Sequence, residues 1–466
     1  MMDGPLRVPA SKAASAGAPA DALAALRAAE TRDGRLDLAM RRELLARLAE
    51  ALLAHREAIA AAIAADFGGR SWMETMLAEV RLVVDAARYA RRHLRAWARP
   101  RRVGVPLPFW PARAWAEWVP KGVVGIMAPW NYPVQLSLLP AVDALAAGNR
   151  VAVKPSEAVP RTAALIGELL DHALGPGIAR TVLGGPEVAA EFARQPWDHL
   201  VFTGGATTGK RVMAAAAEHL TPLTLELGGK CPALVLPGAD LAEAARAILV
   251  GKAINAGQTC IAPDTVLLVG HAPAAFEAAC RATGIAVPET ALASEAQMAR
   301  FAALNATAAS TPLGPGMSGH RIHALALAAA PAPGSPLDCE EVFGPLLPVV
   351  PLRVLDDALA WIAAHPAPLA IYLFGATTAE EARVAAATRS GALVSGRCVE
   401  YAAFPALPFG GVGASGFGRY HGRAGFEEFS VLRARVRHGR WSLARLLDPP
   451  RSGSSKRLVH RLLRGL

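Results

Sequence analysis

Residues 122–131 read GVVGIMAPWN, and they open a stretch that ends with LTLEL at residues 223–227. Short apolar runs alternate with helical patterns throughout this stretch. The runs are Gly122–Ala128, Arg150–Lys154, Ala179–Leu183, His199–Thr203 and Leu223–Leu227. The helical patterns are Ser137–Ala147, Pro160–His172, Pro186–Arg194 and Ala206–His219. This alternation is typical of a doubly wound parallel sheet, so it predicts a Rossmann-like α/β fold.

The rest of the chain divides around this sheet. Leucines recur at three- and four-residue spacings from residue 44 to residue 53, which predicts covering helices over residues 21–102. Residues 102–119 combine three prolines with four aromatic side chains and suit an extended arm better than a core strand. Residues 231–396 alternate again and predict a second α/β domain. Within it, residues 308–336 hold Pro and Gly at many positions, and we expect an irregular loop there.

These patterns give the predicted domains. They are a disordered leader (1–20), a nucleotide-binding domain (21–106 and 120–230), a catalytic domain (231–396), a small β oligomerisation element (107–119 and 397–430) and a basic tail (431–466). Aromatic side chains on a projecting arm need a partner surface to bury them, so we expect a homodimer.

Composition narrows the class of protein. Apolar residues make up 53% of the 466 residues and charged residues 19%, which is typical of a globular protein with more than one domain. The five cysteines lack the spacing of a zinc site, so we expect no metal and a reduced, cytoplasmic protein. The N-terminus lacks the apolar block of a secretory signal, and no stretch reaches the roughly 18 apolar residues of a membrane-spanning helix.

The net charge of +10 is concentrated at one end of the chain. Residues 431–466 contain ten Lys and Arg and one acidic residue, Asp448, so this tail carries +9. A nearly neutral body argues against a groove for nucleic acid. Residues 454–466 place apolar side chains on one helical face and arginines largely elsewhere. This pattern predicts a basic amphipathic helix that contacts an anionic membrane or a partner, with a solvated tail as the alternative.

Unusual residues follow three of the predicted strands, at the edge where doubly wound sheets bind ligands. Glycines from Gly204 to Gly209 follow one strand and open a helix, so backbone N–H groups there can approach a pyrophosphate. Tight packing of the helix on the strand is the alternative explanation. After a neighbouring strand, Lys154 and Glu157 can hold the two hydroxyls of a ribose. The candidate nucleotide-binding residues at these strand ends are Trp130, Lys154, Ser156, Glu157, Gly204, Gly205 and Gly209.

Cys260 lies in the second domain, where a second substrate is expected. A lone cysteine is more often a small buried hydrophobe than a nucleophile, but four motifs in order change that expectation. They are PWNYP (129–133), LELGGK (225–230), GQTC (257–260) and EEVFGP (340–345). Together they resemble the aldehyde dehydrogenase superfamily, over about Leu44 to Ser430. HLTP (219–222), CIAPD (260–264) and GRYHG (418–422) make the resemblance closest to class 3 and coniferyl-aldehyde dehydrogenases.

The resemblance implies a role for each motif. Cys260 is the nucleophile, whose thiolate adds to the aldehyde and holds a thioester after hydride leaves. Glu226 is the base for the thiol or for the hydrolytic water, and its leucine neighbours predict burial and a raised pKa, with a buried ion pair as the alternative. The Asn131 side chain and the Cys260 N–H stabilise the oxyanion. Glu341 holds the nicotinamide ribose and Phe343 flanks the nicotinamide, unless Glu341 is a solvated loop charge.

By the same resemblance the cofactor is NAD or NADP, and Glu157 favours NAD because a carboxylate repels a 2′-phosphate. The substrate is an aromatic or a medium to long aliphatic aldehyde. Two departures favour an inactive scaffold or nucleotide-binding partner instead: Glu341 follows Cys260 by only 81 positions, and Gly205 replaces a polar side chain. A further departure is Gly396, where the resemblance implies an Asn. Cofactor-independent hydrolysis of an ester or thioester at Cys260 is a third hypothesis.

Replacing the nucleophile separates these hypotheses. For a dehydrogenase, an aromatic or long-chain aldehyde with NAD⁺ or NADP⁺ raises the absorbance of the reduced nicotinamide, and Cys260→Ser abolishes the rise because a hydroxyl is a far weaker nucleophile than a thiolate. No signal from the wild type with either cofactor contradicts the dehydrogenase. Full activity in Cys260→Ser contradicts the mechanism.

Overall fold

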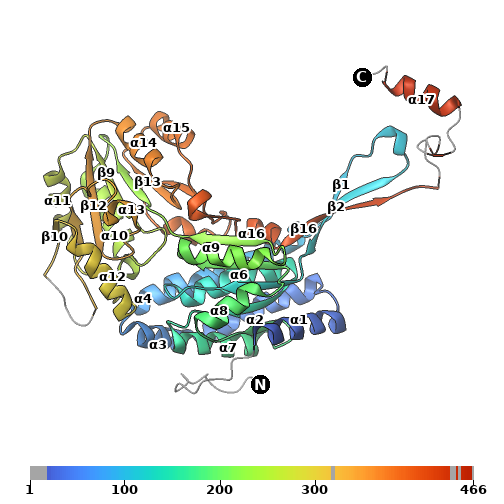
Figure 1. Ribbon diagram of the computed structural model, residues 1–466, viewed down its shortest axis with the longest axis horizontal. Helices are drawn as coiled ribbons and strands as arrows, with labels where there is room; N and C mark the ends of the chain where they lie inside the picture. Colours follow the sequence, from blue (N-terminus) through green and yellow to red (C-terminus); the bar gives the residue numbers. More distant parts are fainter. Residues whose placement is uncertain (1–17, 316–320, 441–444, 446–447, 450–452, 464–466) are drawn as a thin grey trace.

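The computed structural model contains three sheets with covering helices (Figure 1). It describes residues 18–315, 321–440, 445, 448–449 and 453–463. Most of the predicted leader lies outside these residues. Its last two residues, Pro19 and Ala20, instead begin helix α1 (Pro19–Asp33). Proline is favoured at the first helical position because its missing N–H has no partner to lose there.

The predicted doubly wound sheet is present, with strand order β15-β7-β6-β3-β4-β5. Its strands are β3 (Val123–Met127), β4 (Arg150–Lys154), β5 (Ala179–Thr181), β6 (His199–Gly204), β7 (Leu223–Leu227) and β15 (Gly416–Phe417). The first five correspond to the five apolar runs and pair in parallel. The short strand β15 adds antiparallel to β7, with Gly416 opposite Glu226.

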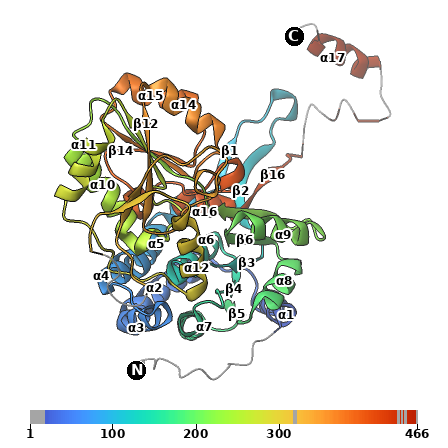
Figure 2. The same cartoon turned by 60° about the vertical axis from the view of Figure 1, so that its left-hand side comes forward.

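Helices cover both faces of this sheet, and Figure 2 shows them from a second side. They are α1, α2 (Leu38–Ala54), α3 (Arg56–Phe67), α4 (Trp72–Glu74), α5 (Leu82–Trp97), α6 (Pro133–Ala147), α7 (Pro160–Ala173), α8 (Pro186–Arg194), α9 (Ala206–Ala217) and α16 (Gly422–Glu428). Alternate strand residues pack into different cores: Val124 and Ile126 face α2, α5, α6 and α7, whereas Val123 and Met127 face α1, α8 and α9. Burial on both faces explains why these strands are continuously apolar.

The second sheet has the order β10-β11-β12-β9-β8-β13-β14. Its strands are β8 (Pro232–Val235), β9 (Thr265–Val269), β10 (Ser310–Pro312), β11 (Ala326–Ala328), β12 (Leu346–Leu352), β13 (Ala370–Phe374) and β14 (Ala392–Ser395). Its helices are α10 (Leu241–Ala253), α11 (Pro273–Ala282), α12 (Glu295–Ala306), α13 (Pro336–Cys339), α14 (Leu355–Ala364) and α15 (Thr378–Ala387).

The expectation of an irregular loop over residues 308–336 is wrong in part. Strands β10 and β11 lie there, and β11 pairs in parallel with β12, so this stretch forms the edge of the second sheet. Each strand has only three residues, too few for alternation to be visible in the sequence. Pairing with β12 and burial of Ala326 and Ala328 hold β11 in place.

The third sheet forms an arm that projects from the body (Figure 1). Its antiparallel strands are β1 (Arg101–Val103), β2 (Arg113–Pro120) and β16 (Ser430–Arg437). The arm therefore takes β1 from the predicted nucleotide-binding segment and β16 from the predicted tail, whereas β15 and α16 join the body. In sequence, strand β16 resembles a solvated tail because arginines alternate with apolar residues. In the structure, every residue of β16 after Ser430 is exposed.

The predicted amphipathic helix is α17 (Gly453–Leu463), beyond the end of the arm (Figure 1). The last three residues of the predicted segment, 464–466, lie outside the described residues. Among the helices that the structure describes, none is long and apolar enough to cross a membrane.

A buried acid attaches the segment after β15 to the body. Asp143 on α6 is 1% exposed, and its Oδ2 accepts the backbone N–H of His421 at 2.8 Å. A side chain at Gly425 would collide with the same carboxyl group, so α16 packs against α6 only with glycine there. Burial raises the pKa of Asp143 to about 8.

We expect Asp143→Asn to become more stable relative to wild type as pH rises. The folded state holds the carboxyl protonated up to about pH 8, while the unfolded chain ionises near its ordinary pKa, so wild-type stability falls between these values. The amide cannot ionise and keeps the acceptor for His421. The difference in Tm between Asp143→Asn and wild type, measured by circular dichroism, should therefore grow from pH 5 to pH 8. Asp143→Ala loses the acceptor and should lose about 1–3 kcal/mol; a pH-independent difference for Asp143→Asn contradicts the assignment.

Candidate active site

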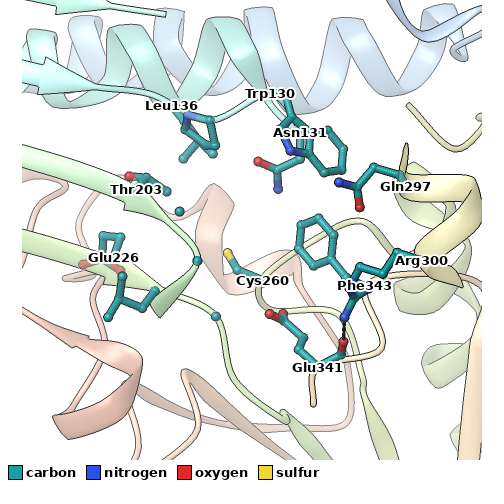
Figure 3. A pocket seen from close by; sticks show the side chains of 15 residues that line it. Trp130, Asn131, Leu136, Thr203, Glu226, Cys260, Gln297, Arg300, Glu341 and Phe343 are labelled. Atoms are coloured by element: carbon teal, nitrogen blue, oxygen red, sulfur yellow. Dashed lines mark hydrogen bonds between the residues drawn. The ribbon is translucent and has the colours of Figure 1, made fainter. Parts of the chain in front are cut away.

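A cavity of about 270 Å³ lies where the carboxyl end of the first sheet faces the second α/β unit. Figure 3 shows the Asn131 amide and the Cys260 sulfur facing the same space, with Glu341 below the sulfur and Glu226 to one side. The predicted residues that line it are Trp130, Asn131, Gly204, Gly205, Glu226, Cys260, Glu341 and Phe343. Residues from four separate motifs thus meet at one place.

Cys260 follows a left-handed turn between α10 and β9. Asn255, Ala256 and Gly257 have φ angles of +51°, +53° and +75°. Non-glycine residues rarely take this conformation, and each costs about 1–2 kcal/mol, so the surroundings must hold the turn. Gly257 lies so close to the carbonyl of Gly344 that a Cβ has no room. The turn presents Cys260 to the cavity.

Asn131 follows β3 and is attached to the Cys260 segment. Its Nδ2 donates to the carbonyl of Gln258 at 3.0 Å, and the hydroxyl of neighbouring Tyr132 bonds the hydroxyl of Thr259 at 2.7 Å. A primary amide has two N–H donors, so one remains for a group in the cavity. The structure thus fixes the orientation of this amide relative to Cys260.

Burial disfavours the charged forms of the cysteine and the two glutamates in the site. It raises the pKa of Cys260 well above its ordinary value, and Glu341, Cys231 and Glu226 raise it further. Burial also raises the pKa of Glu341 to about 8, and that of Glu226 well above the ordinary range even though Arg419 opposes this. No side chain of the described residues bonds the carboxyl oxygens of Glu226, and the nearby backbone N–H of Gly411 opposes the rise of its pKa only weakly. The predicted burial and raised pKa of Glu226 are confirmed, and no ion pair involves it in the described part of the chain.

The loop that carries Glu341 is held from behind by a buried ion pair that the sequence did not predict. Lys230 Nζ lies 2.5 Å from Asp264 Oδ1 and donates to the carbonyl of Glu340 at 3.1 Å. The other oxygen of Asp264 accepts the N–H of Val342 at 2.7 Å. Both charges are desolvated but satisfied by several bonds, the arrangement in which a buried pair is tolerated. Glu341 therefore points into the cavity, and is not a solvated loop charge.

The residues at the strand ends fit a dinucleotide. The first turn of α9 has no side-chain cap, and Gly205 before it borders open space, so its N–H groups are available to a pyrophosphate. After β4, Lys154 Nζ contacts Glu157 Oε2 at 2.8 Å, and Ser156 Oγ accepts the N–H of Ala158. Gly209 instead packs against the sheet: a Cβ there would lie 2.8 Å from Leu227. For Gly209 the structure supports tight packing, the alternative explanation.

Residues outside the four motifs and the predicted strand-end set also line the cavity, namely Leu136, Thr203, Gln297 and Arg300. Gln297 and Arg300 are three residues apart on α12 and share one helical face. Arg300 also donates to the carbonyls of Val342 and Glu341, which joins α12 to the Glu341 loop (Figure 3). The sequence shows that these two residues share a helical face. It does not show that this face of α12 borders the cavity.

Comparison with known proteins identifies the family. Residues 7–434 match the aldehyde dehydrogenase family. The chain belongs to the aldehyde dehydrogenase family. It is an oxidoreductase that acts on aldehydes with NAD(P), as the resemblance predicted.

This dehydrogenase is similar to several other proteins. It is 39% identical to a probable coniferyl aldehyde dehydrogenase of Pseudomonas aeruginosa, covering 91% of this chain and 92% of that protein. It is 33% identical to the 4,4′-diaponeurosporen-aldehyde dehydrogenase of Staphylococcus aureus, covering 84% and 88%. The substrate-bound structure of Staphylococcus aureus AldH superposes with a TM-score of 0.89 at 30% identity, covering 95% of this chain and 99% of that one. The predicted α/β fold is confirmed.

The raised pKa values predict how Cys260 reacts without cofactor. Only the thiolate is alkylated by iodoacetamide, so the rate at Cys260, followed by peptide mass spectrometry, should still be rising at pH 9. Glu341→Gln removes a neighbouring negative charge and should shift the rise to lower pH. Exposed Cys339 is the internal reference for the extent of alkylation. A plateau at Cys260 below pH 8 contradicts the assigned electrostatics.

Proposed function

We propose that this dehydrogenase oxidises aromatic aldehydes of the coniferyl type, or medium to long aliphatic aldehydes, to carboxylic acids through Cys260. The observation that carries this proposal is the meeting of Cys260, Asn131, Glu226 and Glu341 around one cavity. Relatives named for coniferyl aldehyde and for 4,4′-diaponeurosporen-aldehyde favour an apolar substrate. Apolar walls from Trp130, Leu136 and Phe343 agree with this preference.

Cys260 and Asn131 would carry the first half of the reaction. Glu226 takes the proton of the Cys260 thiol, directly or through a water molecule, and passes it to solvent. The resulting thiolate adds to the carbonyl carbon, so a sulfur–carbon bond forms while the C=O π bond becomes an alkoxide. The free N–H of the Asn131 amide and the backbone N–H of Cys260 stabilise this oxyanion. When bound, NAD(P)⁺ accepts the hydride that leaves the tetrahedral carbon. Cys260 then holds the acyl group as a thioester.

Glu226 would carry the second half. As a carboxylate it takes a proton from water while the water oxygen attacks the thioester carbon, and the sulfur leaves as the thiolate of Cys260. A carboxyl group with a raised pKa is a stronger base than an exposed one once it is ionised. Glu226 lines the cavity and forms no ion pair among the described residues, so its carboxylate would be free to accept a proton from water.

The cofactor would lie along the strand ends. The first turn of α9 with Gly204 and Gly205 would hold the pyrophosphate, and Lys154, Ser156 and Glu157 the adenosine end. Trp130, Glu341 and Phe343 would surround the nicotinamide end. Glu157 favours NAD⁺ because its carboxylate can bond a 2′-hydroxyl and repels a 2′-phosphate.

The arm and the tail support proposals on assembly. Leu107 and Trp110 between β1 and β2 are 69% and 61% exposed, and such apolar side chains on an arm suit burial in a homodimer. Helix α17 exposes Val459 and Leu463 together with Arg461, which suits peripheral contact with an anionic membrane. The free state of all five cysteines fits the reduced cytoplasm.

A panel of aldehydes with both cofactors tests the proposed function. We expect kcat/KM to be higher for coniferyl-type or long aliphatic aldehydes than for acetaldehyde, and higher with NAD⁺ than with NADP⁺. Glu157→Gln should reduce the preference for NAD⁺ because the repulsion of the 2′-phosphate is lost. Acetaldehyde as the preferred substrate overturns the substrate class, and a preference for NADP⁺ in the wild type overturns the role of Glu157.

A further inference from the structure

We propose that Arg70 is a positioning residue for the oxyanion site, because it holds the main chain of Asn131 in the place from which the amide reaches the substrate. This inference rests on the proposed role of Asn131. Arg70 precedes α4 in the sequence and does not line the cavity, so it acts through Asn131 and not on the substrate.

Three donors fix Asn131 and the segment before Cys260 together. The carbonyl of Asn131 accepts from Arg70 Nη1 at 2.8 Å and from Asn255 Nδ2 at 2.9 Å. The carbonyl of Gln258 accepts from Asn131 Nδ2 and from Asn255 Nδ2, both at 3.0 Å. Asn255 therefore joins the two segments directly, and Arg70 is the donor that comes from outside them. Without Arg70, the donor left to the Asn131 carbonyl would be Asn255, which belongs to the strained turn.

Arg70 is itself placed by a fully buried set of contacts. Its Nη1 lies 3.3 Å from Glu79 Oε1, and both side chains are 0% exposed. The guanidinium lies over the rings of Phe67 and Tyr132, with its central carbon 5.0 and 4.8 Å from the ring centres. Glu79 comes from the π-helical segment Thr75–Arg81, a helix type often found at functional sites.

Glu79 extends the contact to α6. Its Oε2 accepts the N–H groups of Val134 and Gln135 at 3.0 and 2.8 Å, in the first turn of that helix, where N–H groups otherwise lack partners. Arg70 and Glu79 thus hold the Asn131 loop at both ends: Arg70 at its carbonyl, Glu79 where the helix begins.

Stability alone does not explain an arginine here. Arg70 Nε and Nη2 are buried and have no hydrogen-bond partner among the described residues. Replacing a buried ion pair by apolar residues of similar size is often neutral or stabilising, because the charges no longer have to leave water. A buried pair with two unsatisfied donors is therefore a poor way to gain stability, but it supplies a directed bond to the Asn131 carbonyl.

A double-mutant cycle tests the proposal on the full chain. Arg70→Met with Glu79→Gln removes both charges, keeps their size, and keeps an oxygen for the N–H groups of α6. We expect this pair to fold, as judged by circular dichroism, and to lower kcat on the order of 10- to 100-fold with a much smaller change in KM. In an Asn131→Ala background, the same pair should lower kcat no further, because the positioned group is gone.

Arg150→Met is the matched control. Arg150 is also a fully buried arginine. It is the first residue of β4, at the end of the strand away from the cavity, and it donates to the carbonyls of Gly177 and Ala29. It should lower Tm while kcat stays at the wild-type value. Arg70→Lys, which keeps the charge and one donor, should retain more activity than the Met/Gln pair.

The outcomes distinguish the oxyanion role of Asn131 from the positioning role of Arg70. If Asn131→Ala leaves kcat unchanged, the oxyanion role in the proposed function fails. If Asn131→Ala lowers kcat, but the Met/Gln pair lowers it by the same factor with and without Asn131, Arg70 acts elsewhere and the positioning role is overturned. Wild-type kcat in a folded Met/Gln pair overturns it as well.

Discussion

The carbonyl oxygen of Gln258 accepts hydrogen bonds from Asn131 and Asn255, and the catalytic cavity depends on this junction. Asn131 follows β3 of the first sheet, whereas Asn255 and Gln258 precede β9 of the second sheet. The bonds therefore join two separately wound units at the point where one presents an amide and the other a thiol. The left-handed turn at residues 255–257 is unfavourable in isolation and exists because this junction holds it.

The same cavity concentrates groups whose charged forms are disfavoured. Cys260, Glu226 and Glu341 all have raised pKa values, mainly because burial removes water from them. Behind them, Lys230 and Asp264 are buried as charges because each has several bonds. The bonded pair of Lys230 and Asp264 thus fixes the backbone behind the cavity, and Cys260, Glu226 and Glu341 line the reaction space.

The arm differs from the body in what stabilises it. Strand β16 pairs with β2 along its whole length, yet all its side chains after Ser430 are exposed. Hydrogen bonds fix its register, but burial contributes little within one chain, and three-stranded sheets need an apolar face covered for stability. In the body, by contrast, helices cover both faces of the main sheet and bury its apolar residues within one chain.

The sequence by itself determined the main sheet, the proline starts of α7 and α8, and the four motifs of the site. The hydrophobic period, proline and glycine each determine backbone conformation within a few residues. The apolar runs and the ends of α7 and α8 could therefore be predicted from the sequence alone. Only the tertiary structure decided that β10 and β11 complete the second sheet, that β1 and β16 form the arm with β2, and that Gln297 and Arg300 reach the cavity. It also decided that Arg70 meets Asn131, 61 positions away. These contacts join residues distant in sequence, and short strands or single polar side chains carry no periodic signal, so the packing of whole elements brings them together.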